Sequence, residues 1–389
     1  MARRGLKAVV VGGGIGGLAA GLAMRRAGIE VRVLEARPQL GEIGAGLSLW
    51  PNAVRALERL GVAKQVADRG APLRNDLIQR WDGKVLNRGT IDLQRRFGTP
   101  GFCVRRADLM AALRDALGED AIRTGARVTG VEVTGDGAAA LVEGGDRVEG
   151  SLLVGADGLH SVVRQQLLGD SPRHLGAIAW RGLADLRLSG GGLAVGRGAH
   201  AGWHPVGGDQ TYWFCCINAA PGDSRVGDVR TELLEVFGRW WDPVPSLIQA
   251  TSSREILRHD LYDRPPVWAS AAAAATLLGD AAHPMSPGAG QGACLALEDA
   301  VVLATCLMRR PGPVVALRTY EGERIERARR MQQASLTALR VLQPRSRLGE
   351  LGRDLLLRIP PGLVAGRQSW MFEFRAGGWP RSRLPRSRR

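Results

Sequence analysis

The stretch Val9-Val10-Val11-Gly12-Gly13-Gly14-Ile15-Gly16-Gly17 stands near the start of the chain and decides its fold. The apolar run from Leu6 to Val11 is typical of a buried parallel strand. It leads into the pattern G-x-G-x-x-G and then into small and apolar residues at helical spacing, from Leu18 to Met24. One glycine makes the turn, one lets backbone N–H groups approach a pyrophosphate, and one lets helix and strand pack closely. The phosphate would lie at the helix N-terminus, where unpaired N–H groups and the helix dipole attract an anion.

A second strand is predicted from Glu30 to Leu34, followed at once by Glu35, eighteen residues after Gly17. An acidic side chain at about this spacing typically binds the ribose 2′-hydroxyl of a dinucleotide. The glycine motif alone is also compatible with a glycine-rich turn that binds nothing. Because strand, turn, helix and acidic residue occur together, we expect an adenine dinucleotide, and these residues leave open which one.

The length and the cysteines narrow the class of protein. A chain of 389 residues suits two domains, or one large domain carrying an insertion. Its five cysteines show no ligand-type spacing, and their odd number argues against a disulfide framework, so we expect a reducing cytoplasm and no metal site. Glycines interrupt the apolar stretch near the N-terminus, which argues against a secretory signal, and no stretch sustains the roughly eighteen apolar residues of a membrane-spanning helix.

The formal net charge of +15 raises the possibility of a nucleic-acid partner. Of the 53 basic residues only three are lysines, and the arginines are spread along nearly the whole chain. The one local concentration is at residues 381–389, which we interpret as a solvated tail with weak attraction for polyanions. No recognition motif accompanies the charge, so no specific nucleic-acid partner is expected.

A second strand-to-helix junction lies in the middle of the chain. The apolar run from Leu152 to Val154 enters Gly155-Ala156-Asp157-Gly158, and a helix is predicted to begin near Ser161. Asp157 is compatible with a ligand contact, and equally with an ordinary helix cap.

Residues 176–268 have a different composition, rich in tryptophan and in short strand-like runs separated by glycine-rich turns. They predict an antiparallel sheet, to which a hairpin with its turn at Asp82-Gly83 belongs. Trp180, Trp203 and Trp213 could line a pocket for a flat apolar ligand, although packing in a core is the more common role of any single tryptophan.

The phosphate-binding pattern of the N-terminus recurs late in the chain. The strand at Thr276 to Leu278 runs into Gly279-Asp280, then into a glycine-rich loop ending at Gly290-Gln291-Gly292, and then into a clear helix. Open N–H groups from Ala289 to Gly292 could face negative charge developing on a ring. Beyond it we expect a long helix, Leu317 to Leu342, with Glu321, Glu323, Arg324, Glu326 and Arg327 on its solvent side.

These three motifs, in this order, resemble the FAD-dependent aromatic hydroxylase family, the group A flavoprotein monooxygenases, over about residues 5–340. The local sequence most resembles salicylate-hydroxylase and zeaxanthin-epoxidase-like members, at Gly44-Ala45-Gly46, Pro51-Asn52-Ala53 and Arg106-Ala107-Asp108-Leu109. The resemblance implies an α/β fold with a Rossmann-like FAD-binding domain of the glutathione-reductase type. It also implies an inserted antiparallel β-sheet substrate domain and C-terminal helices. The expected divisions are 1–75, 100–175 and 270–345 for FAD, 76–99 and 176–269 for substrate, and 346–389 for a C-terminal helical segment and basic tail.

The resemblance also implies roles for single residues. Glu35 would hold the adenosine ribose, Arg106 the ribityl or phosphate region, and Asp280 the ribityl chain. Asp157 belongs to a motif implicated in both FAD and NAD(P)H contact. The residues implied to bind FAD are Gly12, Gly14, Ile15, Gly17, Glu35, Ala45, Gly46, Arg106, Asp157, Asp280, Ala289, Gly290, Gln291 and Gly292.

The implied activity is an NAD(P)H-dependent FAD monooxygenase that hydroxylates or epoxidises an aromatic, polycyclic or unsaturated small molecule through a flavin hydroperoxide, with O₂ as co-substrate. NADH or NADPH would dock transiently, which fits the absence of a second G-x-G-x-x-G motif. His283 and Arg181 are the polar candidates near substrate, although a structural hydrogen bond is an equally good role for His283. The alternatives are a flavin dehydrogenase that inserts no oxygen, a flavin halogenase, whose Trp-x-Trp-x-Ile-Pro signature is absent, and a basic binding module. The sequence leaves a monomer and a homodimer equally open.

Overall fold

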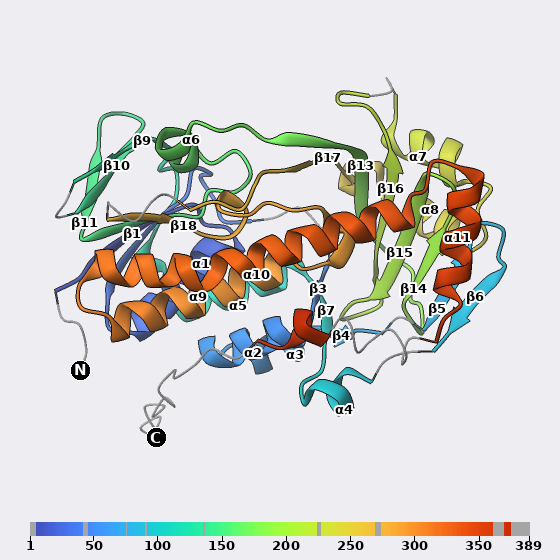
Figure 1. The fold of residues 1–389 in the computed structure, drawn as a ribbon, viewed down its shortest axis with the longest axis horizontal. Helices are drawn as coiled ribbons and strands as arrows, with labels where there is room; N and C mark the ends of the chain where they lie inside the picture. The colour runs from blue at the N-terminus through green and yellow to red at the C-terminus, as the bar shows by residue number, and fades with distance from the viewer. Residues whose placement is uncertain are drawn as a thin grey trace.

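The computed structural model describes residues 5–41, 46–74, 76–89, 92–134, 137–223, 227–268, 274–360 and 369–374. A five-stranded parallel sheet occupies one end of the molecule and a seven-stranded, mostly antiparallel sheet the other (Figure 1). The parallel sheet has the order β18 (Ala275–Leu277), β12 (Leu152–Gly155), β1 (Lys7–Val11), β2 (Glu30–Leu34), β8 (Ile122–Arg123). Its strands come from four distant parts of the chain, and β1 lies at the centre, as the apolar run of valines predicts.

The seven-stranded sheet has the order β17 (Leu257–Asp263), β13 (Arg173–Ala184), β16 (Thr211–Asn218), β15 (Ala199–Pro205), β14 (Gly192–Val195), β5 (Leu77–Arg80), β6 (Val85–Arg88). The hairpin predicted at Asp82-Gly83 is β5–β6, and β5 joins this sheet by parallel pairing with β14. Two smaller antiparallel sheets complete the strands: β11 (Arg147–Gly150), β10 (Ala138–Val142), β9 (Val128–Val133), and β3 (Gly46–Leu49), β7 (Phe102–Arg105), β4 (Ala71–Pro72).

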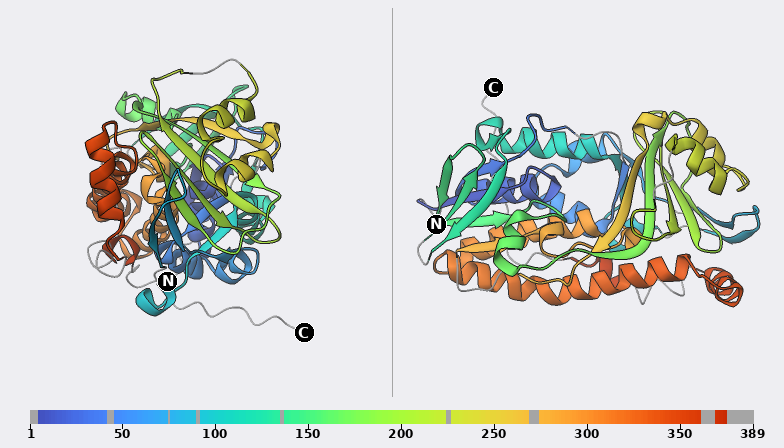
Figure 2. Two further views of the ribbon diagram at one scale, coloured as in Figure 1. Left: turned by 90° about the vertical axis from the view of Figure 1, so that its right-hand side faces the viewer. Right: turned by 90° about the horizontal axis from the view of Figure 1, so that it is seen from above.

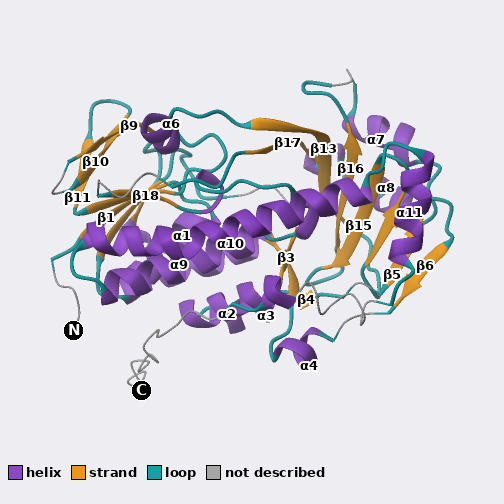
Figure 3. Cartoon of the chain, viewed as in Figure 1, coloured by secondary structure: helices purple, strands orange, loops and turns teal. Residues whose placement is uncertain are grey.

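The helices of the parallel-sheet half are α1 (Ile15–Arg26), α2 (Pro51–Leu60), α3 (Ala63–Ala67), α4 (Leu93–Phe97), α5 (Arg106–Leu117), α6 (Val162–Leu168) and α9 (Gly292–Arg309). Helices α7 (Val229–Phe237) and α8 (Val244–Gln249) cover the seven-stranded sheet. Helix α10 (Pro313–Leu342) runs along the molecule from one sheet to the other and is followed by α11 (Arg347–Leu357) (Figures 2 and 3). Short 3₁₀ turns lie at Glu119–Ala121, Ser253–Glu255, Gly279–Ala281 and Pro287–Ala289.

The main core forms where α1 and α9 pack together over the parallel sheet. Helix α1 is apolar on nearly all sides, and nine of its twelve residues are buried, because it is enclosed by β2, α5 and α9. The smaller β9–β11 sheet packs against β1 and β12. A second core cluster lies under α7 and α8 on one face of the seven-stranded sheet.

The solvent-side prediction for α10 is wrong for Arg324 and only partly right for Glu321 and Arg327. Arg324 is 2% exposed, whereas Glu323 and Glu326 are exposed as expected and Glu321 and Arg327 are partly buried. Arg324 lies on the same helical stripe as Leu317, Tyr320 and Ala328, and carboxylates on α9 neutralise it there. An arginine on the apolar stripe is tolerated because its charge is fully paired.

No helix in the described ranges is both long and apolar enough to cross a membrane. The five cysteines are free thiols and all are buried.

Candidate active site

The turn between β1 and α1 has the geometry that its glycines predict. Gly12 adopts φ +103°, and a Cβ there would stand 2.5 Å from the carbonyl oxygen of Ala156. A Cβ at Gly17 would stand 1.8 Å from the carbonyl oxygen of Gly12, so the close helix–strand approach requires glycine. A Cβ at Gly14 would meet no atom within 4 Å. Gly14 therefore borders open space at the N-terminus of α1, where no side chain caps the helix.

Glu35 lies directly beside this turn. Its carboxylate accepts hydrogen bonds from the backbone N–H of Gly13 at 2.7 Å and of Arg37 at 2.9 Å. An ionised carboxylate offers about four acceptor positions, so capacity remains for a hydroxyl group. A cavity of about 420 Å³ opens here, and its lining includes Gly12, Gly14, Glu35, Arg106 and Asp157.

Asp157 caps helix α6. Its carboxylate accepts hydrogen bonds from the Ser161 hydroxyl at 2.6 Å and from the N–H groups of Val162 and Val163. Burial raises the pKa of the Asp157 carboxyl, and these hydrogen bonds oppose the rise. The capping role left open by the sequence is thus present, on a residue that also lines the cavity.

Asp280 follows β18 in a short 3₁₀ turn that begins at Gly279, a residue with φ +61°. The Asp280 side chain is open to solvent, yet the protein around it displaces enough water that desolvation raises the pKa of its carboxyl. The charges of His283, Arg106 and Arg181 lower that pKa in opposition. A Cβ at Gly292 would stand 3.8 Å from Asp280 Oδ1, so this carboxylate lies next to the start of α9.

The loop before α9 consists of a 3₁₀ turn at Pro287–Ala289, Gly290 with φ +61°, and Gln291. Gln291 is the N-cap residue of α9, and its side chain makes no capping hydrogen bond. The first turn of α9 carries no acidic residue. An uncapped N-terminus of an eighteen-residue helix attracts negative charge.

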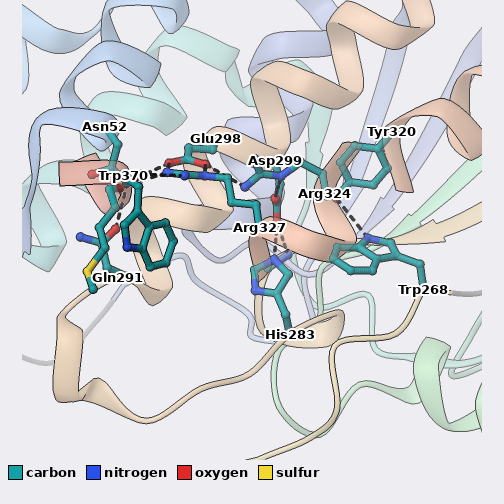
Figure 4. Close-up of polar contacts among 12 residues, drawn as sticks. Asn52, Trp268, His283, Gln291, Glu298, Asp299, Tyr320, Arg324, Arg327 and Trp370 are labelled. Carbon is teal, nitrogen blue, oxygen red and sulfur yellow. Dashed lines mark hydrogen bonds and ion pairs between the residues drawn. The ribbon is translucent and has the colours of Figure 1, made fainter. Parts of the chain in front are cut away.

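Behind this loop lies a buried polar network (Figure 4). His283 Nε2 and Asp299 Oδ2 are 2.6 Å apart, and Arg324 Nε donates to Asp299 Oδ1 at 2.6 Å. Burial alone would raise the pKa of Asp299, but His283 and Arg324 lower it to about 2. His283 is fully buried against Trp268. The structural alternative for His283 therefore accounts for its position, and we do not assign it to substrate.

The network continues from α9 to α2 and to the loop. Arg324 and Arg327 both donate to Glu298, and Asn52 Nδ2 donates to Glu298 Oε1 at 2.8 Å and to Gln291 Oε1 at 2.9 Å. Glu298 fixes the orientation of the Asn52 amide, because only the amide nitrogen can donate to a carboxylate. Several buried polar atoms around the loop have no hydrogen-bond partner among the described residues: Trp50 Nε1, Asn52 Oδ1, His283 Nδ1, Ser286 Oγ and Gln291 Nε2.

The seven-stranded sheet turns a mixed face toward the parallel-sheet half. Arg181 on β13 pairs in register with Phe214 and Leu257, so all three side chains lie on one face. Tyr212 and His259 share this face, because side chains alternate along a strand. Desolvation, with the charges of Arg181 and Arg106, lowers the pKa of His259.

One contact and one electrostatic interaction join this face to the other half. A Cβ at Gly46 would stand 2.4 Å from the Tyr212 ring, so strand β3 touches β16 there. The charge of Arg181 also reaches Asp280. No hydrogen bond or ion pair joins the half-buried Arg181 guanidinium to any other residue in the described parts of the chain.

The three tryptophans lie on the opposite face. Trp180, Trp203 and Trp213 are 1 to 3% exposed in the core cluster beneath α7 and α8. Trp213 Nε1 donates to Thr251 Oγ1 at 2.8 Å. Packing accounts for all three side chains, and we do not assign them to substrate.

The structure thus brings the predicted residues to two places. Gly12, Gly14, Glu35, Arg106 and Asp157 border one cavity, while Ile15 and Gly17 are buried just inside α1. Asp280 and residues 289–292 lie together at the start of α9. Ala45 lies outside the described residues.

Sequence reasoning missed Asn52, Glu298 and Asp299 as parts of the site. The available signal was Glu298-Asp299, two adjacent acids inside an otherwise apolar helix, since buried charges require partners. It also missed Tyr212 and His259, which the strand alternation around Arg181 could have indicated.

The chain matches a known protein family over most of its length. The model described as "FAD binding domain" matches residues 6–182 and 274–335, more than half of the chain. The chain belongs to the FAD-dependent aromatic hydroxylase family. Its cofactor is FAD, and it is a FAD-dependent monooxygenase. In the described residues no group of three or more His, Cys, Asp or Glu could hold a metal ion.

Individual relatives agree with the family. The chain is 41% identical over 332 residues to an aurachin C monooxygenase/isomerase of Stigmatella aurantiaca, covering 84% of this chain and 87% of the relative. It is 34% identical to a FAD-dependent urate hydroxylase of Klebsiella pneumoniae, covering 83% of this chain and 87% of that protein. The crystal structure of Klebsiella pneumoniae HpxO complexed with FAD and uric acid superposes with a TM-score of 0.88 at 29% identity, covering 95% of this chain and 97% of that one.

Proposed function

We propose that this flavoprotein uses NADH or NADPH and O₂ to insert one oxygen atom into a flat aromatic or heteroaromatic substrate that carries an ionisable oxygen. When bound, FAD supplies the redox chemistry, taking hydride from the nicotinamide and activating O₂. The observation that carries the substrate class is the half-buried Arg181 guanidinium. Its charge lowers the pKa of Asp280, and no acceptor binds it among the described residues.

The residues present fit FAD. Open space at Gly14 and the uncapped N-terminus of α1 suit a pyrophosphate, and the remaining acceptor capacity of Glu35 suits a ribose hydroxyl. The unpartnered Gln291 amide nitrogen and the N-terminus of α9 suit the electron-rich edge of a flavin ring. We assign to FAD Gly12, Gly14, Ile15, Gly17, Glu35, Gly46, Arg106, Asp157, Asp280, Ala289, Gly290, Gln291 and Gly292.

Substrate would lie between the loop before α9 and the sheet face of Arg181, Tyr212 and His259. Arg181 would bind the ionised oxygen, and Phe214 would pack against the ring. His259 stays neutral at pH 7 because desolvation and nearby arginines lower its pKa, so it can accept or donate a hydrogen bond without adding charge. Bringing the sheet over the loop also excludes water from the reacting atoms. We keep the division into an FAD-binding part, an inserted substrate part and a C-terminal segment as part of this proposal.

Relatives support an acidic aromatic substrate. The names of several contain urate, 3-amino-4-hydroxybenzoate and 3-hydroxybenzoate. Each of these carries an ionisable oxygen on or beside a flat ring.

The test is a screen of the purified yellow protein with NADH and NADPH against phenols, hydroxybenzoates and hydroxylated heterocycles. We expect substrate-stimulated NAD(P)H oxidation and one atom of labelled O₂ in the product. A product without label would instead favour the dehydrogenase alternative. Arg181→Met should raise KM at least about tenfold, the loss of one charge-assisted contact. Arg187→Met, at an exposed arginine that pairs with the exposed Asp209, is the matched control and should leave KM unchanged.

A further inference from the structure

A short C-terminal segment, residues 369–374, lies far from α11, the helix that precedes it in the chain. Figure 1 shows it in red beside α3 and below β3 and β7, near the middle of the molecule, while α11 stands at the right-hand end. Phe374 is buried there, and Arg330 of α10 lies over the Trp370 ring, 3.9 Å from its centroid. The segment is therefore docked against the parallel-sheet half.

Hydrogen bonds connect the segment to the loop before α9. Arg327 donates to the carbonyl oxygens of Trp370 at 3.1 Å and Met371 at 3.0 Å, and the same guanidinium binds Glu298. Glu298 accepts from Asn52, and Asn52 donates to Gln291. Figure 4 shows Trp370, Arg327, Glu298, Asn52 and Gln291 side by side.

An aromatic route leads to the neighbouring residue of the same loop. Phe372 stacks on Trp50, with ring centroids 4.9 Å apart and planes 25° apart, and packs edge-on against Phe97. Trp50 Nε1 lies 3.1 Å from the position that a Cβ at Gly290 would take. Arg55 donates to the Phe372 carbonyl at 2.7 Å, which fixes the ring against Trp50.

Both routes end at the loop before α9, at Gly290, the C-cap of the 3₁₀ turn Pro287–Ala289, and at Gln291, the N-cap of α9. The loop has little support of its own, since Gly290 has no side chain, and Gln291 makes no capping bond and leaves its amide nitrogen unpartnered among the described residues. Asn52 and Trp50 therefore fix the position of the loop. The C-terminal segment supports Trp50 through Phe372, and supports Asn52 through Arg327 and Glu298. A displacement of this loop by even 1 Å would misplace its donors, which costs about 10²-fold in well-oriented reactions.

We propose that residues 369–374 hold the loop at 287–291 in position, and that Phe372 exerts this effect by stacking on Trp50. The proposal rests on the function proposed above, in which this loop faces the flavin ring. Phe372 acts through Trp50 and touches neither cofactor nor substrate. The segment consequently controls how tightly FAD is held and how much activated oxygen is lost as peroxide.

The test compares Phe372→Ala and Phe372→Leu with Glu373→Ala, a change at the exposed neighbour in the same segment. Leucine keeps most of the apolar volume and loses the ring stack, so this variant keeps the test informative if the alanine variant does not fold. We expect both Phe372 variants to raise the dissociation constant of FAD about tenfold or more, the value of one well-packed contact. We also expect brighter flavin fluorescence and a larger share of oxidised NAD(P)H appearing as peroxide. Glu373→Ala should match the wild type in all three.

The FAD titration and the fluorescence need no substrate, so they decide this proposal even if the oxygen-insertion screen fails. Wild-type values for FAD affinity and fluorescence in Phe372→Leu would overturn it. Hydrogen exchange of the wild-type protein gives a second test. Binding of FAD to the apoprotein should slow amide hydrogen exchange at residues 369–374. Unchanged exchange there would also overturn the proposal.

Discussion

Arg327 forms a bidentate ion pair with Glu298: Nε donates to Oε2 at 2.6 Å and Nη2 donates to Oε1 at 2.6 Å. Glu298 is fully buried in α9 and also accepts a hydrogen bond from Arg324, which binds the adjacent Asp299. The network therefore removes two carboxylates and two guanidinium groups from most of the surrounding water, and they stabilise one another.

We expect Glu298→Gln to lower the free energy of unfolding by about 3–5 kcal/mol, because Arg327 loses its carboxylate partner and the buried Arg324 keeps only Asp299 of its two. Urea denaturation of the apoprotein measures this loss. Glu323→Gln, at an exposed position of α10, is the control and should change stability by less than about 0.5 kcal/mol. Equal stability of the two variants would show that the network contributes little.

Substitutions at two glycines of the N-terminal turn should distinguish an effect on folding from an effect on cofactor binding. Gly17→Ala places a Cβ 1.8 Å from the Gly12 carbonyl oxygen and should destabilise the apoprotein by about 2 kcal/mol or more. Gly14→Ala meets no protein atom within 4 Å, so the apoprotein should fold normally while FAD affinity falls at least about tenfold. Thermal unfolding without FAD and a fluorescence titration with FAD give the two quantities. Normal FAD affinity in Gly14→Ala would place the pyrophosphate elsewhere.

Asp280 is expected to hold the cofactor directly. Its carboxylate is open to solvent beside the start of α9, so Asp280→Ala should fold like the wild type and yet purify without stoichiometric FAD. The absorbance ratio of flavin to protein after gel filtration measures this. Full FAD content in the variant would contradict the assignment of Asp280.

Glu321 should make stability depend on pH. Burial raises the pKa of its carboxyl to about 7, against a hydrogen bond from Thr276 that lowers it. A folded-state pKa above the unfolded value means that the native protein is most favoured while Glu321 is protonated, and that stability is lost as pH rises from about 4.5 to 7 and levels off above it. Glu321→Gln keeps an acceptor for Thr276 and cannot ionise. We expect it to exceed the wild type by about 1–2 kcal/mol at pH 8 and by much less at pH 5, measured by urea denaturation.

The tryptophans offer a test of packing against substrate binding. Trp213→Phe removes the hydrogen bond to Thr251 and part of a buried ring, so the free energy of unfolding should fall by about 1–3 kcal/mol. The KM for the substrate found in the screen should stay within about twofold of the wild type, because a core residue leaves substrate affinity nearly unchanged. A large change in KM with unchanged stability would show that Trp213 binds substrate.

Local patterns in the sequence were sufficient for the strand–turn–helix at Gly12 and for the antiparallel sheet. These elements depend on residues adjacent in the chain, such as the valines of β1 and the Asp82-Gly83 turn of β5–β6. The family resemblance, carried by motifs around Gly12, Asp157 and Asp280, supplied the cofactor and the activity.

The sequence alone could not pair His283 with Asp299 or Asn52 with Glu298, since 16 and 246 residues separate these partners. It also could not tell which face of the sheet α7 and α8 would cover, and the role of Trp213 depends on that choice. Arg324 is different, because its helical stripe also carries the buried residues Leu317, Tyr320, Ala328 and Met331. The helical spacing therefore predicted that Arg324 is buried, but its charge favoured the solvent side.

The burial of α1 has a consequence for biosynthesis. The helix is complete at Arg26, but α9, which covers it, begins only at Gly292. At about 5–20 residues per second, the ribosome takes roughly 10–50 s to make the intervening chain. During that time β2 and α5 can pack against this apolar helix, but the face that α9 covers in the folded protein has no cover. We therefore expect an N-terminal fragment that contains the whole glycine motif but ends before Gly292 not to fold as an independent domain, because the face of α1 that α9 covers stays exposed.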